Sequence, residues 1–306
     1  MRPLILQLDD ALDRQDALTG RVRAEGGQVL AARDLGPAMR LWSRASTLVA
    51  LRSRLGEIAA PAADGLLVFA GSGDFHHVTP LLVARAAAAA DEPVTVLHFD
   101  NHPDWVRQAR GRHCGSWVGE AARLSGVAKV ITIGVCSPDI GRKGSQRGDL
   151  ALIDEDRLDL YAWRAPDGGG EVALESRSWP TISAMGEAAF IARLAAEIPT
   201  RAIYVTIDKD VLAAEGAVTN WDQGQASVDF LIEAITAAAS GRRVVGADVV
   251  GDWSAPVYGD GPVAWALKRG EAFLDQPRTR PEPAAASALN EAVNLRLLDL
   301  FSGLAS

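Results

Sequence analysis

Short apolar runs alternate with longer amphipathic segments along most of this chain. The apolar runs have the length of strands and cover residues 4–8, 66–70, 94–99, 129–135, 202–207 and 243–250. Segments whose apolar positions recur with helical spacing cover residues 78–90, 117–124, 187–198, 228–239 and 287–301. The stretch 22–55 is also predicted to be mostly helical, with breaks at Gly26-Gly27 and near Gly36-Pro37.

Strands that are apolar along their whole length are buried on both faces, which is typical of a parallel sheet covered by helices. The alternation of strands and helices therefore predicts an α/β fold with three layers, α/β/α, around a central, mostly parallel sheet. Proline and glycine gather at 166–170 and 276–283, which we predict to be surface loops. Neither loop marks a domain boundary, and we expect one domain over residues 1–306.

Charge and cysteine content limit the partners and the compartment. The formal net charge of −8 argues against nucleic acid, whose binding depends on basic groups, and against an anionic membrane surface. The two cysteines, Cys114 and Cys136, are too few for a disulfide framework and fit a reducing compartment. The chain has no apolar run near ~18 residues, the length that spans a membrane, and its first residues do not resemble a signal peptide. We therefore expect a cytoplasmic protein.

Three polar clusters follow directly after predicted strands. They are Gly-Ser-Gly-Asp-Phe-His-His at 71–77, Asp-Asn-His-Pro-Asp at 100–104 and Asp-Lys-Asp at 208–210. Ligands of open parallel sheets bind at the carboxyl ends of the strands, so the three clusters are expected to meet in one crevice. In extended chain, residues two positions apart point the same way, which lets each cluster direct its side chains at one point.

About four carboxylates at one point cannot be buried without cations. Two divalent metal ions are the natural counter-ions. Oxygen-rich ligands with one or two imidazoles suit Mn²⁺, while ligand type alone leaves Zn²⁺, Fe²⁺, Co²⁺ and Ni²⁺ open. Two such ions ~3.5–4 Å apart can deprotonate a water and so provide a nucleophile at neutral pH.

The clusters resemble the signatures of a known family, the arginases and agmatinases. The cluster at 100–104 resembles their Asp-Ala-His-x-Asp signature, and 208–210 resembles the start of Asp-x-Asp-x-x-Asp-Pro. The cluster at 71–77 is similar to their Gly-Gly-Asp-His-Ser segment. The order of the three is the same, and the resemblance spans roughly residues 66 to 255. It implies an arginase-like fold and a ureohydrolase with two metal ions, most commonly Mn²⁺.

The resemblance also implies roles for individual residues. The positions that match metal ligands are Asp100, His102, Asp104, Asp208, Asp210 and one histidine of the first cluster. His76 aligns best with that histidine, and its neighbour His77 is the alternative. His113 resembles the histidine that relays a proton to the leaving amine, a task that suits the pKa of imidazole. Asp210 resembles the ligand that also hydrogen-bonds the reaction intermediate.

The sequence departs from the family pattern where the substrate is expected to bind. Gly251 stands where arginases carry the glutamate that pairs with the guanidinium group, and the neighbouring Asp252 is the candidate replacement. Trp105 and Trp221 are further candidates for contact with the substrate. Indole rings favour an apolar or flat cationic group over an amino acid, so L-arginine is not the expected substrate. The family's later Asp-Pro pair is also missing, since positions 213 and 214 are alanine.

These observations predict a metal-dependent hydrolase that cleaves a C–N bond of a small guanidino or amidino compound. Two alternatives stay open: a two-metal amide or formimino hydrolase, and a non-catalytic, metal-binding relative with a regulatory role. The resemblance further implies a possible homo-oligomer. His98 lies inside the strand 94–99 and is predicted to be a packed histidine, whereas Asp74 either orients a ligand or turns the chain.

Overall fold

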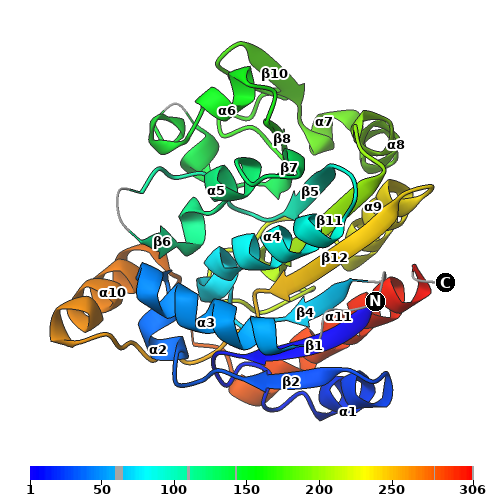
Figure 1. Ribbon diagram of the computed structural model, residues 1–306. Helices are drawn as coiled ribbons and strands as arrows, with labels where there is room; N and C mark the ends of the chain where they lie inside the picture. Colours follow the sequence, from blue (N-terminus) through cyan, green and yellow to red (C-terminus); the bar gives the residue numbers. More distant parts are fainter. Residues whose placement is uncertain (59–64, 109–110, 142, 279, 305–306) are drawn as a thin grey trace.

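Eight parallel strands form the central sheet of the structure (Figure 1), in the order β2-β1-β4-β12-β11-β5-β7-β8. The structure is a computed structural model that describes residues 1–58, 65–108, 111–141, 143–278 and 280–304. Every pair of neighbouring strands in this sheet runs parallel. The strands are β1 (Arg2–Gln7), β2 (Gln28–Ala31), β4 (Leu66–Phe69), β5 (Val94–Phe99), β7 (Val127–Val135), β8 (Leu158–Ala162), β11 (Ala202–Asp208) and β12 (Arg243–Val250).

The middle of the sheet is buried on both faces, as the continuous apolar runs predicted. All residues of β5 and β11 are buried. The register places Ile207 opposite Phe99 and Asp208 opposite Val250. The strands β5, β11 and β12 therefore end at the same level, and the residues that follow them are brought to one edge of the sheet.

Helices cover both faces of the sheet. On one side α4 packs against α5 and against β11 and β12, and on the other α9 packs against α8 and α11, which in turn contacts α1. The helices are α1 (Asp16–Ala24), α2 (Gly36–Met39), α3 (Ala45–Glu57), α4 (Thr79–Ala89), α5 (Val118–Ala122), α6 (Ala151–Asp154), α7 (Ile182–Met185), α8 (Glu187–Glu197), α9 (Val228–Ala239), α10 (Pro262–Asp275) and α11 (Pro283–Gly303). Within the described part of the chain, no helix combines the length and apolar character that crossing a membrane requires.

Short strands and 3-10 turns connect the main elements. The bridge strands β3 (Trp42–Ser43) and β6 (Arg112–His113) pair antiparallel, as do β9 (Glu171–Leu174) and β10 (Arg177–Pro180). The 3-10 turns are η1 (Gly73–Val78), η2 (Cys114–Ser116), η3 (Pro138–Ile140), η4 (Ser145–Arg147) and η5 (Lys209–Val211). Two of them, η1 and η5, directly follow β4 and β11 and carry residues of the predicted clusters.

The predicted three-layer fold is confirmed, and the sheet is parallel throughout. The prediction for 22–55 was wrong in its middle, because Gln28–Ala31 forms the edge strand β2 beside β1 rather than helix. The break at Gly26-Gly27 lies between α1 and β2, as expected, whereas Gly36-Pro37 begins the short helix α2. The last helix begins before residue 287, at Pro283, because the Glu282 side chain accepts hydrogen bonds from the Ala284 and Ala285 amides.

Candidate metal centre

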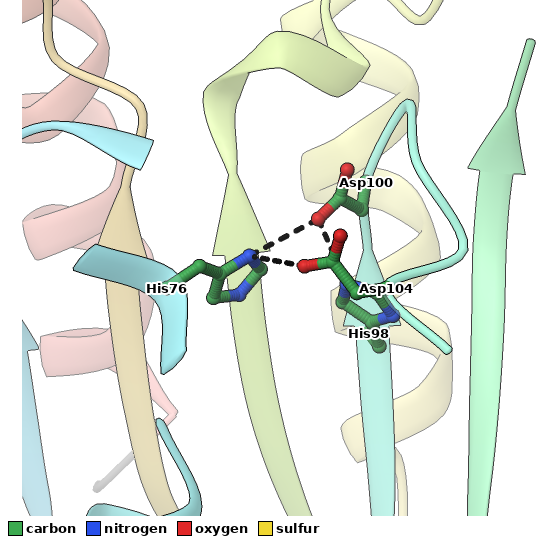
Figure 2. A group of neighbouring side chains, drawn as sticks. All are labelled: His76, His98, Asp100 and Asp104. Atoms are coloured by element: carbon green, nitrogen blue, oxygen red, sulfur yellow. Dashed lines mark hydrogen bonds and ion pairs between the residues drawn. The ribbon is translucent and has the colours of Figure 1, made fainter. Parts of the chain in front are cut away.

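The three polar clusters meet at the carboxyl edge of the sheet. His76 lies in η1, after β4, while Asp208 ends β11 and Asp210 lies in η5. Asp100 and Asp104 lie on the loop that leaves β5. Figure 2 shows the His76 ring directed at the carboxylates of Asp100 and Asp104, with His98 behind them on β5.

His76 is held so that one ring nitrogen faces carboxylates. Its Nε2 donates to the Thr206 hydroxyl (2.9 Å), which itself donates to Asp248 (2.9 Å). In the neutral ring Nδ1 therefore carries the lone pair, and it lies 3.1 Å from Asp100 Oδ2, 3.2 Å from Asp104 Oδ2 and 3.7 Å from an oxygen of Asp208. This buried nitrogen makes no hydrogen bond within the described residues. A lone pair directed at several carboxylates fits a metal cation between them.

His102 lies on the other side of Asp100, also with one ring nitrogen facing carboxylates, and here that nitrogen is hydrogen-bonded to Asp210. Its Nε2 donates to Asp222 (3.0 Å), while Nδ1 lies 2.9 Å from Asp210 Oδ2 and 3.5 Å from Asp100 Oδ1. A carboxylate on the outer nitrogen fixes the ring of a metal-binding histidine and makes the inner nitrogen a better donor to the metal.

Asp100 belongs to both groups. One group brings together His76, His98, Asp100 and Asp104, and the other brings together Asp100, His102 and Asp210, each within the reach of one metal ion. Oδ2 of Asp100 faces His76, whereas Oδ1 accepts the backbone amide of His102 (2.6 Å) and faces the His102 ring. The two groups are therefore adjacent and share one carboxylate.

The carboxylates of the cluster repel one another. Burial, followed by the charge of Asp100, raises the pKa of Asp208 to about 7. The same two causes raise the pKa of Asp210 well above its ordinary value. Raised carboxyl pKa values mean that the fully ionised cluster is unfavourable by itself, and a cation is the charge that stabilises it.

Asp104 reaches the cluster through an unusual backbone conformation. Its φ is +46°, in the left-handed region, which aspartate tolerates better than most residues. Its Oδ2 accepts a hydrogen bond from the Trp117 indole (2.6 Å), and that indole also packs against the His76 and His98 rings at 4.8 Å. Trp117 thus fixes the orientation of three side chains of the cluster.

The two histidines of the first cluster differ in their surroundings. His77 is fully buried, and neither of its ring nitrogens has a hydrogen-bond partner among the described residues. Burial, followed by the charge of His113, lowers the pKa of His77 well below its ordinary value. The structure therefore brings His76 to the carboxylates and leaves His77 as a neutral, buried neighbour.

His113 lies beside the cluster, in β6. Its Nδ1 accepts the amide of Gly115 (2.8 Å), and a Cβ added at Gly115 would lie 3.7 Å from Asp104 Oδ1. Its Nε2 pairs with the Glu271 carboxylate of α10. Only Gly115 therefore separates the His113 ring from the proposed ligand Asp104. Both ring nitrogens of His113 already have hydrogen-bond partners.

The three residues predicted to contact the substrate lie in different surroundings. Trp221 is half-buried, donates to Asp74 (2.9 Å) and packs edge-on against His102 at 5.7 Å, so it lies at the cluster. Trp105 is only 1% exposed and is part of the core. Asp252 lies in a buried ion pair with Lys209 (2.8 Å) and accepts hydrogen bonds from neighbouring amides, so groups of the chain already use its charge.

The supporting contacts that several residues make with the cluster were not predicted from the sequence. His98 donates to Asp100 (2.9 Å) and bonds to Thr132 (3.1 Å), so it orients a proposed ligand. Its spacing of two from Asp100 along β5 was a usable signal, because both side chains point the same way. The contacts of Asp222 and Glu271 had no such signal, since neither follows a motif.

Gly251 leaves no room for the glutamate of the family pattern. Its φ is +92°, and an added Cβ would lie 2.4 Å from Asp208 Oδ1. On the other side, a Cβ at Gly73 would lie 2.4 Å from Asp208 Oδ2. The Asp208 carboxylate is therefore sandwiched between two glycines, and any side chain at position 251 would displace a proposed ligand.

Fold and cluster together define an α/β protein with a group of potential metal ligands at the carboxyl edge of its parallel sheet. The sequence model of the Arginase family matches residues 27–252, and the chain belongs to that family.

The chain is also similar to solved structures and to one curated protein. Arginase from Bacillus cereus superposes with a TM-score of 0.57 at 15% identity, with 96% of each chain covered. A hypothetical agmatinase from Burkholderia thailandensis gives a TM-score of 0.51 at 16% identity, covering 97% of this chain and 86% of that chain. An uncharacterized protein of Thermotoga maritima is 23% identical over 186 residues, which is 61% of this chain and 58% of that protein. The superpositions show that the chains share a fold. At identities this low, they do not identify the substrate of this protein.

The Lys209–Asp252 pair generates a first prediction. Asp252→Ala leaves the Lys209 ammonium buried and unpaired, so the free energy of unfolding is expected to fall by ~3–5 kcal/mol in urea titrations. The double variant Lys209→Met/Asp252→Leu should recover most of that loss. A stable Asp252→Ala protein with impaired substrate binding would instead assign Asp252 to the substrate.

Gly251 generates a second prediction, with Gly241 as its matched control. Both glycines have a positive φ, +92° and +71°, but an added Cβ at Gly241 meets nothing within 4 Å. Gly251→Ala is therefore expected to lower metal affinity by ~10–100-fold, because Asp208 must move. Gly241→Ala should cost stability alone and leave metal affinity unchanged, as measured by calorimetric titration with Mn²⁺. Equal metal affinity in both variants would contradict the packing argument.

Proposed function

We propose that this protein is a binuclear-metal hydrolase that cleaves a C–N bond in a small guanidino or amidino compound. The observation that carries the proposal is the pair of histidine Nδ1 atoms, in His76 and His102, that face carboxylates on either side of Asp100. Membership of the Arginase family supports a hydrolase of this kind. We further propose that residues 1–306 act as one domain.

The donor atoms suit two Mn²⁺ ions. The first ion would be held by His76, Asp100, Asp104 and Asp208, and the second by His102, Asp100, Asp208 and Asp210. Oxygen donors outnumber nitrogen donors in both sets, which favours Mn²⁺ over softer ions. When bound, a pair of such ions acidifies water and so supplies a nucleophile at neutral pH.

The chain itself orients the reaction. Asp210 accepts the Asn101 amide (2.9 Å), which keeps its carboxylate directed at His102 and at the reacting centre. His113, beside Asp104, passes a proton to the leaving amine. Access is from the side of His102 and Asp222, whose side chains are 17% and 55% exposed, whereas His76 is buried.

The site does not favour plain L-arginine. Gly251 offers no carboxylate to a guanidinium group, and Asp252 is already paired with Lys209. Trp221 presents an indole beside His102 instead. The substrate is therefore expected to be flatter or more apolar than an amino acid.

The crowding at Gly251 also supports a second candidate, a two-metal amide or formimino hydrolase. Such a substrate carries less positive charge and does not require a carboxylate at that position. The two candidates differ in their products, because urea is released only from a guanidino compound.

A substrate panel with a pair of matched variants tests the proposal. The Mn²⁺-loaded protein is expected to release urea or ammonia from at least one guanidino, amidino, formimino or amide compound. His76→Asn and Asp210→Ala should reduce that rate more than ~100-fold, since each removes a proposed metal ligand. His77→Asn, at the neighbouring buried position, should retain the rate apart from any loss of folded protein.

Either of two results would count against the proposal. Full turnover in His76→Asn or Asp210→Ala would show that the cluster is not catalytic. A folded, Mn²⁺-loaded protein that hydrolyses no member of the panel would favour a non-catalytic, metal-binding role.

A further inference from the structure

A groove runs along α10, close to the proposed centre. It has a volume of about 540 Å³ and lies between the Trp42 indole and one side of the helix, formed by Leu267, Gly270 and Leu274. Two carboxylates of α10, Glu271 and Asp275, also line it. Figure 1 shows α10 at the left of the molecule, beside β6, the element that carries His113.

The walls of the groove are apolar and open to solvent. Leu267 is 61% exposed and Leu274 is 80% exposed, which is unusual for leucine in a folded protein. Gly270 lies between them, and a Cβ added there would meet nothing within 4 Å. The space above Gly270 is therefore large enough to accept an apolar group of a ligand.

Glu271 differs from the other acids near the centre because it has no permanent cation. Asp74 is paired with Arg40 (2.6 Å), and Asp252 is paired with Lys209 (2.8 Å). Within the described residues, Glu271 pairs with His113 and with no lysine or arginine. A carboxylate whose one partner is an imidazole remains available to a stronger cation.

The neighbouring charges add to the attraction for a cation. Burial, followed by the charge of Glu271, raises the pKa of Asp275, which indicates that the two acids lie close together. Lys268, one turn earlier, is buried and donates to the Ala38 carbonyl (2.7 Å). Its ammonium lies beneath the helix, against one face of Trp42, and does not line the groove, although its charge is close enough to interact with Glu271.

The groove is connected to the proposed centre through one residue. Glu271 contacts His113, and the Gly115 amide that binds His113 lies next to Asp104. His113 therefore lies between the proposed centre and Glu271, and the groove begins on the far side of His113.

We propose that the groove between Trp42 and α10 binds the non-reacting end of the substrate, an organic cation with an apolar body. Glu271 receives the positive charge, and Leu267, Leu274 and Trp42 contact the apolar part. This inference rests on the proposed function for the link to catalysis. The groove supplies, from a different element, the carboxylate that Gly251 lacks.

Binding of a non-reacting probe tests the groove without any turnover. Benzylamine, a cation at neutral pH, is expected to give saturation-transfer NMR signals with the full chain, and neutral benzyl alcohol much weaker ones. Glu271→Gln should weaken benzylamine binding by ~10-fold or more, through loss of the ion pair. Asp275→Asn, which changes the other carboxylate of the groove, should weaken it by less than ~3-fold.

Gly270→Leu provides an independent test of the location. An added Cβ meets nothing within 4 Å and leucine improves helix propensity, so thermal stability should be maintained while the side chain occupies the groove and benzylamine binding is lost. Undiminished binding in Gly270→Leu or Glu271→Gln, or a larger loss in Asp275→Asn, would overturn the proposal. These outcomes are independent of whether the protein hydrolyses any compound, so failure of the groove and failure of the proposed function remain distinguishable.

Discussion

Mutual repulsion among buried carboxylates is the constraint on which the rest of this structure depends. Asp100, Asp104, Asp208 and Asp210 lie at one edge of the sheet, where burial makes each added negative charge costly. The parallel sheet produces this convergence because β5 and β11 end at the same level. We propose that two divalent cations balance the charges, and that this requirement links the α/β scaffold to hydrolytic chemistry.

The surroundings of the cluster are organised to keep its ligands in place. Outer carboxylates or hydroxyls hold the far nitrogens of His76 and His102, and a tryptophan holds Asp104. Glycines on both sides let the chain pack directly against Asp208. This close packing has a consequence for specificity, because position 251 cannot carry a substrate-binding side chain. We propose that recognition of the substrate comes from elements outside the three polar clusters, such as α10.

The parts of this protein that can be predicted from the sequence are those that follow a simple pattern of residue types and spacing. Buried strands such as β5 and β11 are continuously apolar, and acids placed two apart after a strand point to one site. The edge strand β2 was taken for helix because its partly exposed residues carry no such apolar run. The helix α10 was missed, since its exposed leucines do not give the pattern of a core-facing helix. The contacts of Asp222 and Glu271 depend on tertiary packing between distant segments, which one sequence does not specify.

The most direct test of this account is anomalous diffraction from crystals of the full chain grown with Mn²⁺. The account predicts two manganese peaks ~3.5–4 Å apart on either side of the Asp100 carboxylate, one next to His76 Nδ1 and the other next to His102 Nδ1. A single peak would reduce the site to a one-metal centre and contradict the binuclear proposal. Absence of manganese in well-ordered crystals would show that the acids are balanced by protons and ion pairs alone.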